Sequence, residues 1–144
     1  SNSNKVVVAY KDSANSSHGT AIVGTVSGTA ISFGTAAVFE SASTDGEVAI
    51  FDSNSNKVVI AYRDHGNSSH GTAVVGTVSG TSISFGTVVV FKTATTEKIA
   101  ATFDSNSNKV VIAYTDGGNS QYGTGIIGTV SGTSISYGTA VAFV

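Results

Sequence analysis

The sequence predicts an all-β protein, and three observations lead to this prediction. The 144 residues include 22 Ser and 18 Thr, whereas charged residues make up only 11% of the chain. Short segments rich in Val, Ile, Thr, Tyr and Phe recur along it, and these residue types favour the pleated surface of a sheet. No segment of ten or more residues shows the 3.6-residue apolar period of an amphipathic helix. We therefore expect strands and turns, and no helix.

An internal repeat organises the chain. The motif Ser-Asn-Ser-Asn-Lys begins at Ser1, Ser53 and Ser105, so the period is 52 residues. Segments 1–40 and 53–92 are identical at 31 of 40 positions, and the latter matches 105–144 at 29 of 40. These near-identical copies predict one repeat domain over the whole chain.

The units of this domain follow from the period. They are 1–52, 53–104 and 105–144. The last unit lacks the connecting strand segment that 41–52 supplies in the first unit, and no equivalent of that segment precedes Ser1. One unit is therefore expected to hold three strands unless the C-terminal segment Thr139–Val144 or a neighbouring chain fills the gap.

Four strands are predicted in each unit. In the second repeat they are Val48–Phe51, Lys57–Tyr62, Thr72–Val78 and Ser82–Phe91, with an interruption at Gly86 in the last. The runs Val58–Ala61 and Val88–Phe91 are apolar at every position, so both faces of these strands are expected to be covered.

The segments between the strands have the composition of turns. Ser53–Asn56 and Ser79–Gly80 predict hairpins, and Asp64–Gly71 predicts a longer polar loop. Hairpins join antiparallel neighbours, so a mostly antiparallel arrangement is expected.

A repeat of about 40 to 50 residues with four strands, covered on both faces, is typical of a β-propeller blade. Three such blades do not close a ring, because propellers use about four to eight. We expect another chain to complete the ring, with a head-to-tail homodimer giving six blades. Neighbouring blades of a longer chain are the alternative.

The unit "ATFDSNSNKVVIAYTDGGNSQYGTGIIGTVSGTSISYGTAVAF" resembles tandem propeller repeats of large, repetitive surface or appendage proteins of marine microbes, their phages and some invertebrates. The resemblance covers essentially the whole chain. It implies a propeller fold with a structural or ligand-binding role, and it carries no catalytic motif. It also implies an extracellular or surface-associated location. The chain has no Trp, so it departs from sialidase-type propellers and their Trp-containing Asp-box.

Composition argues against several classes of function. A net charge of −2 provides no basic surface for nucleic acid. No apolar run approaches the roughly 20 residues that span a bilayer, so no membrane partner is expected. Zero Cys excludes disulfides and thiolate metal sites. Since no hydrolase, phosphate-binding or metalloprotease motif is present, we expect no enzyme and no cofactor. The missing initiator Met and signal peptide predict a mature form or an excised fragment.

One group of polar residues recurs in all three units. It combines a Tyr at a strand end with an Asp, an Asn and a Ser in the loop that follows. The members are Tyr10, Asp12, Asn15, Ser16, Tyr62, Asp64, Asn67, Ser68, Tyr114, Asp116, Asn119 and Ser120. Such groups bind sugar hydroxyls and stack on a pyranose ring, which predicts a shallow glycan site on each blade. The alternative is that Asp and Asn bind their own loop backbone and Tyr belongs to the core.

A second recurring motif begins at Asp52 and Asp104 and matches the start of a calcium loop, D-x-N-x-N. Position six is Lys57 or Lys109 where such a loop needs Gly, and position twelve is not Glu. A hairpin in which Asp52 pairs with Lys57 is the favoured interpretation, and no metal site is predicted. His18 and His70 are replaced by a Tyr in the third unit, which favours loop packing over zinc binding.

The acidic residues of the connecting segments are interpreted as solvated charge. They are Glu40, Asp45, Glu47 and Glu97. Taken together, the sequence predicts a non-enzymatic structural or display module of an extracellular or virion-surface assembly. The alternative is a multivalent lectin that uses the recurring loops.

Overall fold

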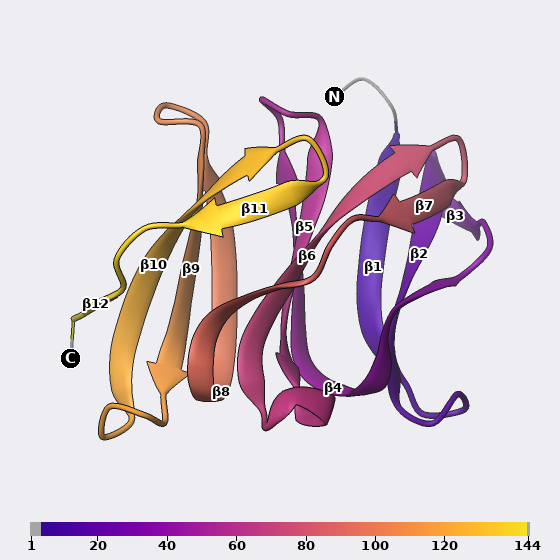
Figure 1. Cartoon of the computed structure of the whole chain (residues 1–144). Helices are drawn as coiled ribbons and strands as arrows, with labels where there is room; N and C mark the ends of the chain where they lie inside the picture. Colours follow the sequence, from indigo (N-terminus) through magenta and orange to yellow (C-terminus); the bar gives the residue numbers. More distant parts are fainter. Residues whose placement is uncertain (1–3, 144) are drawn as a thin grey trace.

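The computed structural model describes residues 4–143, and its twelve strands form one antiparallel sheet that does not close on itself (Figure 1). The strands are β1 (Lys5–Asp12), β2 (His18–Ser27), β3 (Ala30–Phe33), β4 (Ala37–Asp52), β5 (Lys57–Asp64), β6 (His70–Ser79), β7 (Ser82–Phe85), β8 (Val89–Asp104), β9 (Lys109–Asp116), β10 (Tyr122–Ser131), β11 (Ser134–Tyr137) and β12 (Val141–Ala142). A single 3₁₀ turn, η1 (His65–Asn67), follows β5. The all-β prediction is confirmed.

Two long strands divide this sheet into three layers, which stand side by side in Figure 1. The first half of β4 pairs with β2, and from Thr44 onward β4 pairs with β5. In the same way β8 pairs first with β6 and, from Thr96, with β9. We call β1–β3 with the first half of β4 layer 1. Layer 2 extends from the second half of β4 to the first half of β8, and layer 3 holds the remaining strands.

The antiparallel prediction is confirmed for every strand pair, but two expected boundaries differ. The expected strand Val48–Phe51 is the end of the 16-residue β4, because the connecting segment continues in extended form from one layer into the next. In the expected strand Ser82–Phe91 the interruption predicted at Gly86 is confirmed, but it is longer than expected, since the chain is outside the sheet from Gly86 to Val88 and the segment is divided between β7 and the start of β8.

The two-sided burial argument is confirmed for Val58–Ala61, whose four side chains are all buried. These residues alternate between the two faces of layer 2. Val58 and Ile60 belong to the apolar cluster shared with layer 1, whereas Val59 and Ala61 belong to the cluster shared with layer 3. The same argument was wrong for Val88, which lies outside any strand and is exposed.

The layers approach each other closely at two glycines. A Cβ atom on Gly34 would lie 2.0 Å from the carbonyl oxygen of Thr81 in the β6–β7 turn, and one on Gly86 would lie 1.8 Å from that of Thr133. Only glycine fits at such distances, so these positions determine how near one layer lies to the next hairpin.

Layer 1 is narrower than the other two. Among residues 4–143, β1 pairs with β2 alone, whereas β5 and β9 each pair with a second strand supplied by β4 or β8. The edge strand that β4 supplies to layer 2 and β8 supplies to layer 3 therefore has no equivalent in layer 1 among residues 4–143. β1 consequently presents a free edge.

Candidate functional site

The three recurring polar loops lie at the same end of the molecule, at the bottom of Figure 1. They join β1 to β2, β5 to β6 around η1, and β9 to β10. All three share a backbone in which two successive residues have positive φ, among them Ser16, Ser68 and Ser120 at 52° to 55°. The three loops thus share this left-handed backbone at equivalent positions, which their common sequence specifies.

The loop carboxylates hold this turn together. Asp12 Oδ1 accepts a hydrogen bond from the backbone N–H of Ala14 at 3.1 Å, and Asp116 Oδ1 accepts one from Gly118 at 2.9 Å. Asp64 caps η1 by accepting from the N–H of Asn67 at 3.2 Å. Asp64 and Asp116 are also buried. Turn formation is therefore the role that the structure assigns to these carboxylates.

The tyrosine rings of the second and third units are buried in the core. Tyr62 is 0% exposed and lies 5.0 Å from the ring of Phe39, while Tyr114 is 2% exposed and lies 5.3 Å from that of Phe91. Burial is the main cause that raises the pKa of both phenols. These two rings have no face available for a sugar. Tyr10, on the outer side of layer 1, is half-buried.

The amides and hydroxyls of the loops remain exposed. They are Asn15, Ser16, Asn67, Ser68, Asn119 and Ser120. The Asn and Ser of each unit lie together in one loop. No hydrogen bond links one loop to another among the described residues. The structure thus presents three separate, shallow groups of hydrogen-bonding side chains at one end, without an aromatic platform in the second and third.

At the opposite end, Asp52 and Asp104 organise the β4–β5 and β8–β9 hairpins. Asp52 Oδ1 accepts from the N–H groups of Asn54 and Ser55, and its Oδ2 accepts from the Ser55 hydroxyl at 2.6 Å. A side-chain hydrogen bond from Ser107 lowers the pKa of Asp104. The carboxylates are used by their own turns, which agrees with the hairpin interpretation.

The expected Asp52–Lys57 ion pair was wrong. The two residues face each other in the strand register, but Lys57 Nζ donates instead to Thr77 Oγ1 of β6 at 2.9 Å. Lys5 and Lys109 make the same contact with Thr25 and Thr129. Each first lysine of a repeat therefore ties two strands of its own layer.

The structure contains a row of ion pairs across the layers that the sequence analysis missed. Asp45 in β4 contacts Lys11 of layer 1 at 3.0 Å and Arg63 of layer 2 at 2.8 Å. Arg63 in turn contacts Glu97 in β8 at 3.2 Å. Asp45 and Glu97 keep the exposure expected of solvated charge, with 37% and 45% of their side chains exposed, and they also take part in this row of ion pairs. Asp45 and Glu97 occupy the same position of the repeat, 52 residues apart, and so do Lys11 and Arg63. This recurrence of opposite charges was the signal in the sequence that could have indicated the ion pairs.

His65 completes the row, with Nε2 at 2.6 Å from Asp45 Oδ2. This hydrogen bond is the largest cause that lowers the pKa of Asp45 well below its ordinary value of 3.8, and bonds from Arg63 and Lys11 lower it further. The carboxylate stays ionised and links two layers. Its neighbours are Lys11, Arg63 and His65 rather than further carboxylates, so the row is built for pairing and not for holding a metal.

The other connecting acids also have partners. Glu40 Oε2 accepts from the Tyr62 hydroxyl at 3.2 Å, and Glu47 accepts from the Thr44 hydroxyl. Within residues 4–143 no group of three or more His, Asp or Glu side chains could hold a metal ion. The described residues also contain no helix long and apolar enough to cross a membrane.

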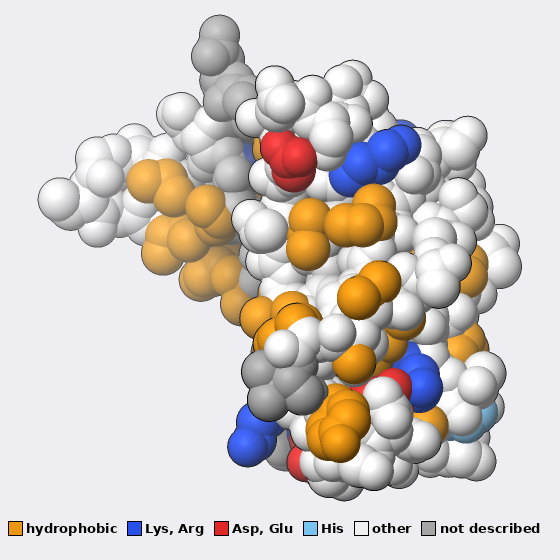
Figure 2. Space-filling model, turned by 90° about the vertical axis from the view of Figure 1, so that its left-hand side faces the viewer, with side chains coloured by type: hydrophobic (Ala, Val, Ile, Leu, Met, Phe, Trp, Pro, Cys, Tyr) orange, Lys and Arg blue, Asp and Glu red, His pale blue; other side chains and the backbone are white. Residues whose placement is uncertain are grey.

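The two ends of the stack of layers expose apolar faces. We call Val6, Val8, Ile31 and Phe33 the outer face of layer 1, and Ile127, Val141 and Phe143 the outer face of layer 3. Figure 2 looks onto the side of the molecule formed by layer 3 and shows hydrophobic side chains in a column down this surface, with charged groups mainly near its upper and lower ends. These exposed apolar faces are separate from the polar loops, and patches of this kind usually mark a contact surface.

Comparison with protein-family models, with curated proteins and with solved structures found no match to this chain.

Proposed function

We propose that this chain is a non-enzymatic structural module whose layers continue into further copies of itself, and that it displays its polar loops at one end of the assembly. The observation that supports this proposal is a correspondence between the outer faces and the buried interfaces. At a spacing of 52 residues, each exposed apolar residue on an outer face has a counterpart that is buried or partly buried between two layers.

Layer 1 illustrates the correspondence. Val8 is 42% exposed, whereas its counterpart Ile60 in layer 2 is 0% exposed and packs against layer 1. Ile31 is likewise exposed, and its counterpart Ile83 is buried in the same cluster. The outer face of layer 1 therefore has the chemistry of a surface that packs onto a preceding layer.

Layer 3 has the complementary chemistry. Ile127 is 43% exposed and Phe143 is 64% exposed, while their counterparts Val75 and Phe91 are 0% and 8% exposed between layers 2 and 3. If layer 3 of one copy packs onto layer 1 of another, each contact repeats one that the chain already makes internally. Such a head-to-tail contact is heterologous, and it closes into a ring when the rotation per layer permits.

A closed ring of six layers from two copies is the β-propeller form of this proposal, and neighbouring units of a longer chain are its covalent equivalent. We propose an extracellular or virion surface as the location of such an assembly, which is what the resemblance of the repeat implies. In either form the three loops of each copy lie at one end, and a dimer presents six of them.

Native mass spectrometry of the intact chain tests the proposal. With a chain mass of 14.4 kDa, we expect a species of twice that mass. Ile127→Asp should convert it to a folded monomer, because a charge on the outer face of layer 3 would be buried without a partner. The matched variant Val75→Asp places the same charge inside the chain and should prevent folding. A monomer at every concentration, in the unmodified chain, would contradict self-association.

A second candidate is a multivalent glycan-binding protein, and the shared orientation of the three loops favours it. Exposed amide and hydroxyl groups at one end suit weak, repeated contacts with sugar hydroxyls. Isothermal titration with a panel of simple sugars should give heat for at least one of them. The heat should disappear in a combined Asn15→Ala, Asn67→Ala and Asn119→Ala variant with an unchanged Tm. No heat for any sugar removes this candidate.

A further inference from the structure

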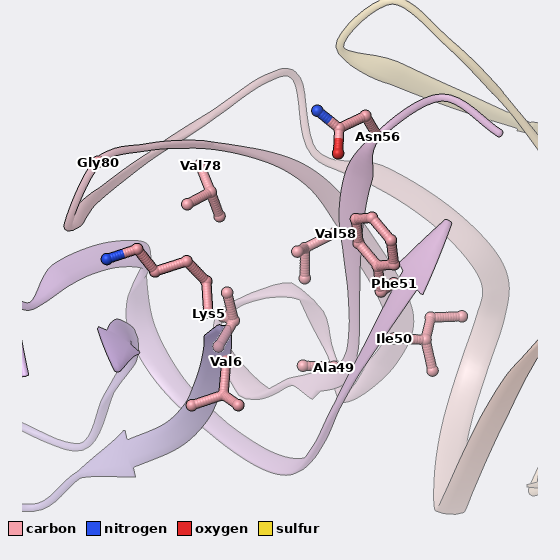
Figure 3. A pocket seen from close by; sticks show the side chains of 10 residues that line it. Lys5, Val6, Ala49, Ile50, Phe51, Asn56, Val58, Val78 and Gly80 are labelled. Carbon is pink, nitrogen blue, oxygen red and sulfur yellow. The ribbon is translucent and has the colours of Figure 1, made fainter. Parts of the chain in front are cut away.

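A cleft of about 500 Å³ lies beside the free edge of β1, between layers 1 and 2. Figure 3 shows Val58 and Val78 of layer 2 facing the end of β1 that carries Lys5 and Val6, with Ala49 of β4 nearby. Ile50, the next residue of β4, also borders the cleft, but its side chain points away in Figure 3 and packs against the cluster between layers 2 and 3. Most of the lining side chains are apolar, Lys5 and Asn56 are the polar ones among them, and an unpaired strand edge borders the cleft.

The same place between layers 2 and 3 is filled by Ile50. Ala49, Val58 and Val78 correspond, at a spacing of 52 residues, to Ala101, Val110 and Val130. All three counterparts belong to the apolar cluster between layers 2 and 3, or pack against it, and so does Ile50. The cluster between layers 1 and 2 contains the equivalent lining but no counterpart of Ile50 among residues 4–143. The cleft thus has the lining that receives an aliphatic side chain from a first strand.

The charges along β1 match those of such a strand. In layer 2 the register places Asp52 opposite Lys57 and Asp45 opposite Arg63. In β1 the equivalent positions are Lys5 and Lys11, so both ends of its free edge carry a cation. Because Arg63 pairs with Asp45 whereas Lys57 makes no ion pair with Asp52, Lys11 is the cation of this edge that an acidic residue of the segment would contact.

We propose that the free edge of β1 and this cleft form an acceptor site for an extended segment of a partner repeat unit. The segment has the chemistry of Thr44–Asp52: acidic near both ends, with an aliphatic side chain at the place of Ile50. It adds to layer 1 as an antiparallel strand and inserts that side chain into the cleft. The two segments of this type within the chain are paired with β5 and β9, so the donor is a separate unit. This site uses a strand edge and goes beyond the stacking of outer faces.

A peptide with the sequence of residues 44–52, TDGEVAIFD, tests the proposal against the intact chain. Labelled peptide, followed by fluorescence anisotropy, should bind with saturation at one site. A matched peptide with Asp at the place of Ile50 should bind about tenfold more weakly or worse, because it would bury a charge in the apolar cleft. Amide chemical-shift changes should concentrate on β1 and on the residues that line the cleft. Absence of binding, or equal binding of the two peptides, overturns the proposal.

A charge exchange locates the site on the protein. Lys11→Glu should weaken binding of TDGEVAIFD, and a peptide whose first Asp is replaced by Lys should recover affinity for that variant, because Asp45 pairs with Arg63 at the equivalent place in layer 2. Failure of the exchange to restore binding, with a folded variant, overturns the assigned register.

The Ile127→Asp chain separates this proposal from self-association. This variant should bind the peptide as the unmodified chain does, because Ile127 lies in layer 3 and β1 lies in layer 1, with layer 2 between them. Loss of peptide binding in Ile127→Asp would place the site on the outer face and overturn the acceptor role of β1. Peptide binding by a chain that never dimerises would support the acceptor site and contradict only the stacking proposal.

Discussion

Tyr62 and Tyr114 occupy the same place in the repeat but have different neighbours. The hydroxyl of Tyr62 donates to Glu40. The counterpart of Glu40 is Lys92, whose ammonium pairs with Asp116 at 2.6 Å. The hydroxyl of Tyr114 is consequently buried without a hydrogen-bond partner among the described residues. One substitution in the repeat thus changes the hydrogen bonding of a ring in another strand.

This difference predicts opposite results for two matched variants. Tyr114→Phe should leave the free energy of unfolding unchanged or raise it by about 1 kcal/mol, because it removes an unpaired buried hydroxyl. Tyr62→Phe should lower it by about 1 kcal/mol, because Glu40 loses a donor. Urea unfolding followed by circular dichroism measures both. Equal losses in the two variants would show that the Tyr114 hydroxyl is paired after all.

Among the elements, β4 and β8 have the unusual task of joining two layers without leaving extended conformation. Each contains a β-bulge after the crossing point, between Asp45 and Val48 in β4 and between Glu97 and Ala100 in β8. The bulge of β4 has Gly46 at φ 66°, whereas the bulge of β8 has Lys98 at φ 49°. A left-handed backbone is unfavourable for a residue with a Cβ atom, so the second bulge is the less stable of the two.

Lys98→Gly should therefore stabilise the chain by about 0.5–1 kcal/mol, since relief of the left-handed backbone outweighs the added entropy of glycine. The reciprocal variant Gly46→Lys should destabilise it by a similar amount. No atom lies within 4 Å of a Cβ at position 46, so a steric clash would not explain that loss. Thermal unfolding of the two variants provides the comparison.

The row of ion pairs predicts a pH dependence. The pKa of Asp45 is lowered in the folded state, so the carboxylate contributes stability above its unfolded pKa, near 3.8. That contribution is lost progressively as the pH falls below this value. Asp45→Asn should therefore cost about 1 kcal/mol or less near pH 7, after solvent screening, and nothing at the acidic end of the range.

The control for this variant is Glu97→Gln. Glu97 contacts Arg63 alone and is the more exposed of the two acids, so its replacement should lower the free energy of unfolding by less than Asp45→Asn near neutral pH. Urea unfolding over a pH series measures both differences. A constant difference between Asp45→Asn and the unmodified chain, from neutral to acidic pH, would contradict the assigned role of the carboxylate.

At the scale of the whole molecule, the close approach between layers provides a test of whether layer 3 of one copy packs onto layer 1 of a second copy. Gly34 and Gly86 are each approached by the next hairpin, whereas a Cβ on their counterpart Gly138 would meet only the carbonyl oxygen of Ile127, at 3.9 Å. In a head-to-tail pair that repeats the internal contacts, Thr29 of the second copy would approach Gly138 as Thr133 approaches Gly86.

Gly86→Ala should destabilise the chain, because the added methyl group collides with backbone that cannot move without separating the layers. Gly138→Ala should leave the Tm of the monomer unchanged but abolish the dimer seen by native mass spectrometry. A Gly138→Ala chain that dimerises normally would show that the copies meet in another geometry.

Much of this architecture was predictable from local pattern. The runs around Val59 gave strands buried on both faces, and the Ser79–Gly80 turn gave a hairpin, because strand and turn preferences depend on neighbouring residues. The sequence also suggested, as an alternative, that Asp64 binds the backbone of its own loop, because such hydrogen bonds again involve only neighbouring residues. By contrast, the ion pairs Lys11–Asp45 and Arg63–Glu97 join residues 34 positions apart in neighbouring layers, and no local pattern reports such a distance.

By itself, the sequence determined a threefold repeat of antiparallel strands, because hydrophobic period, turn residues and self-similarity are properties of the chain in one dimension. Only the tertiary structure decided that each connecting segment crosses from one layer to the next as a single strand, that Tyr62 and Tyr114 face the core, and that β1 has a free edge. These features depend on which layers meet. Packing between layers depends on side chains that come from separate repeats. Because the repeats are nearly identical in local sequence, that sequence does not determine which layers contact each other.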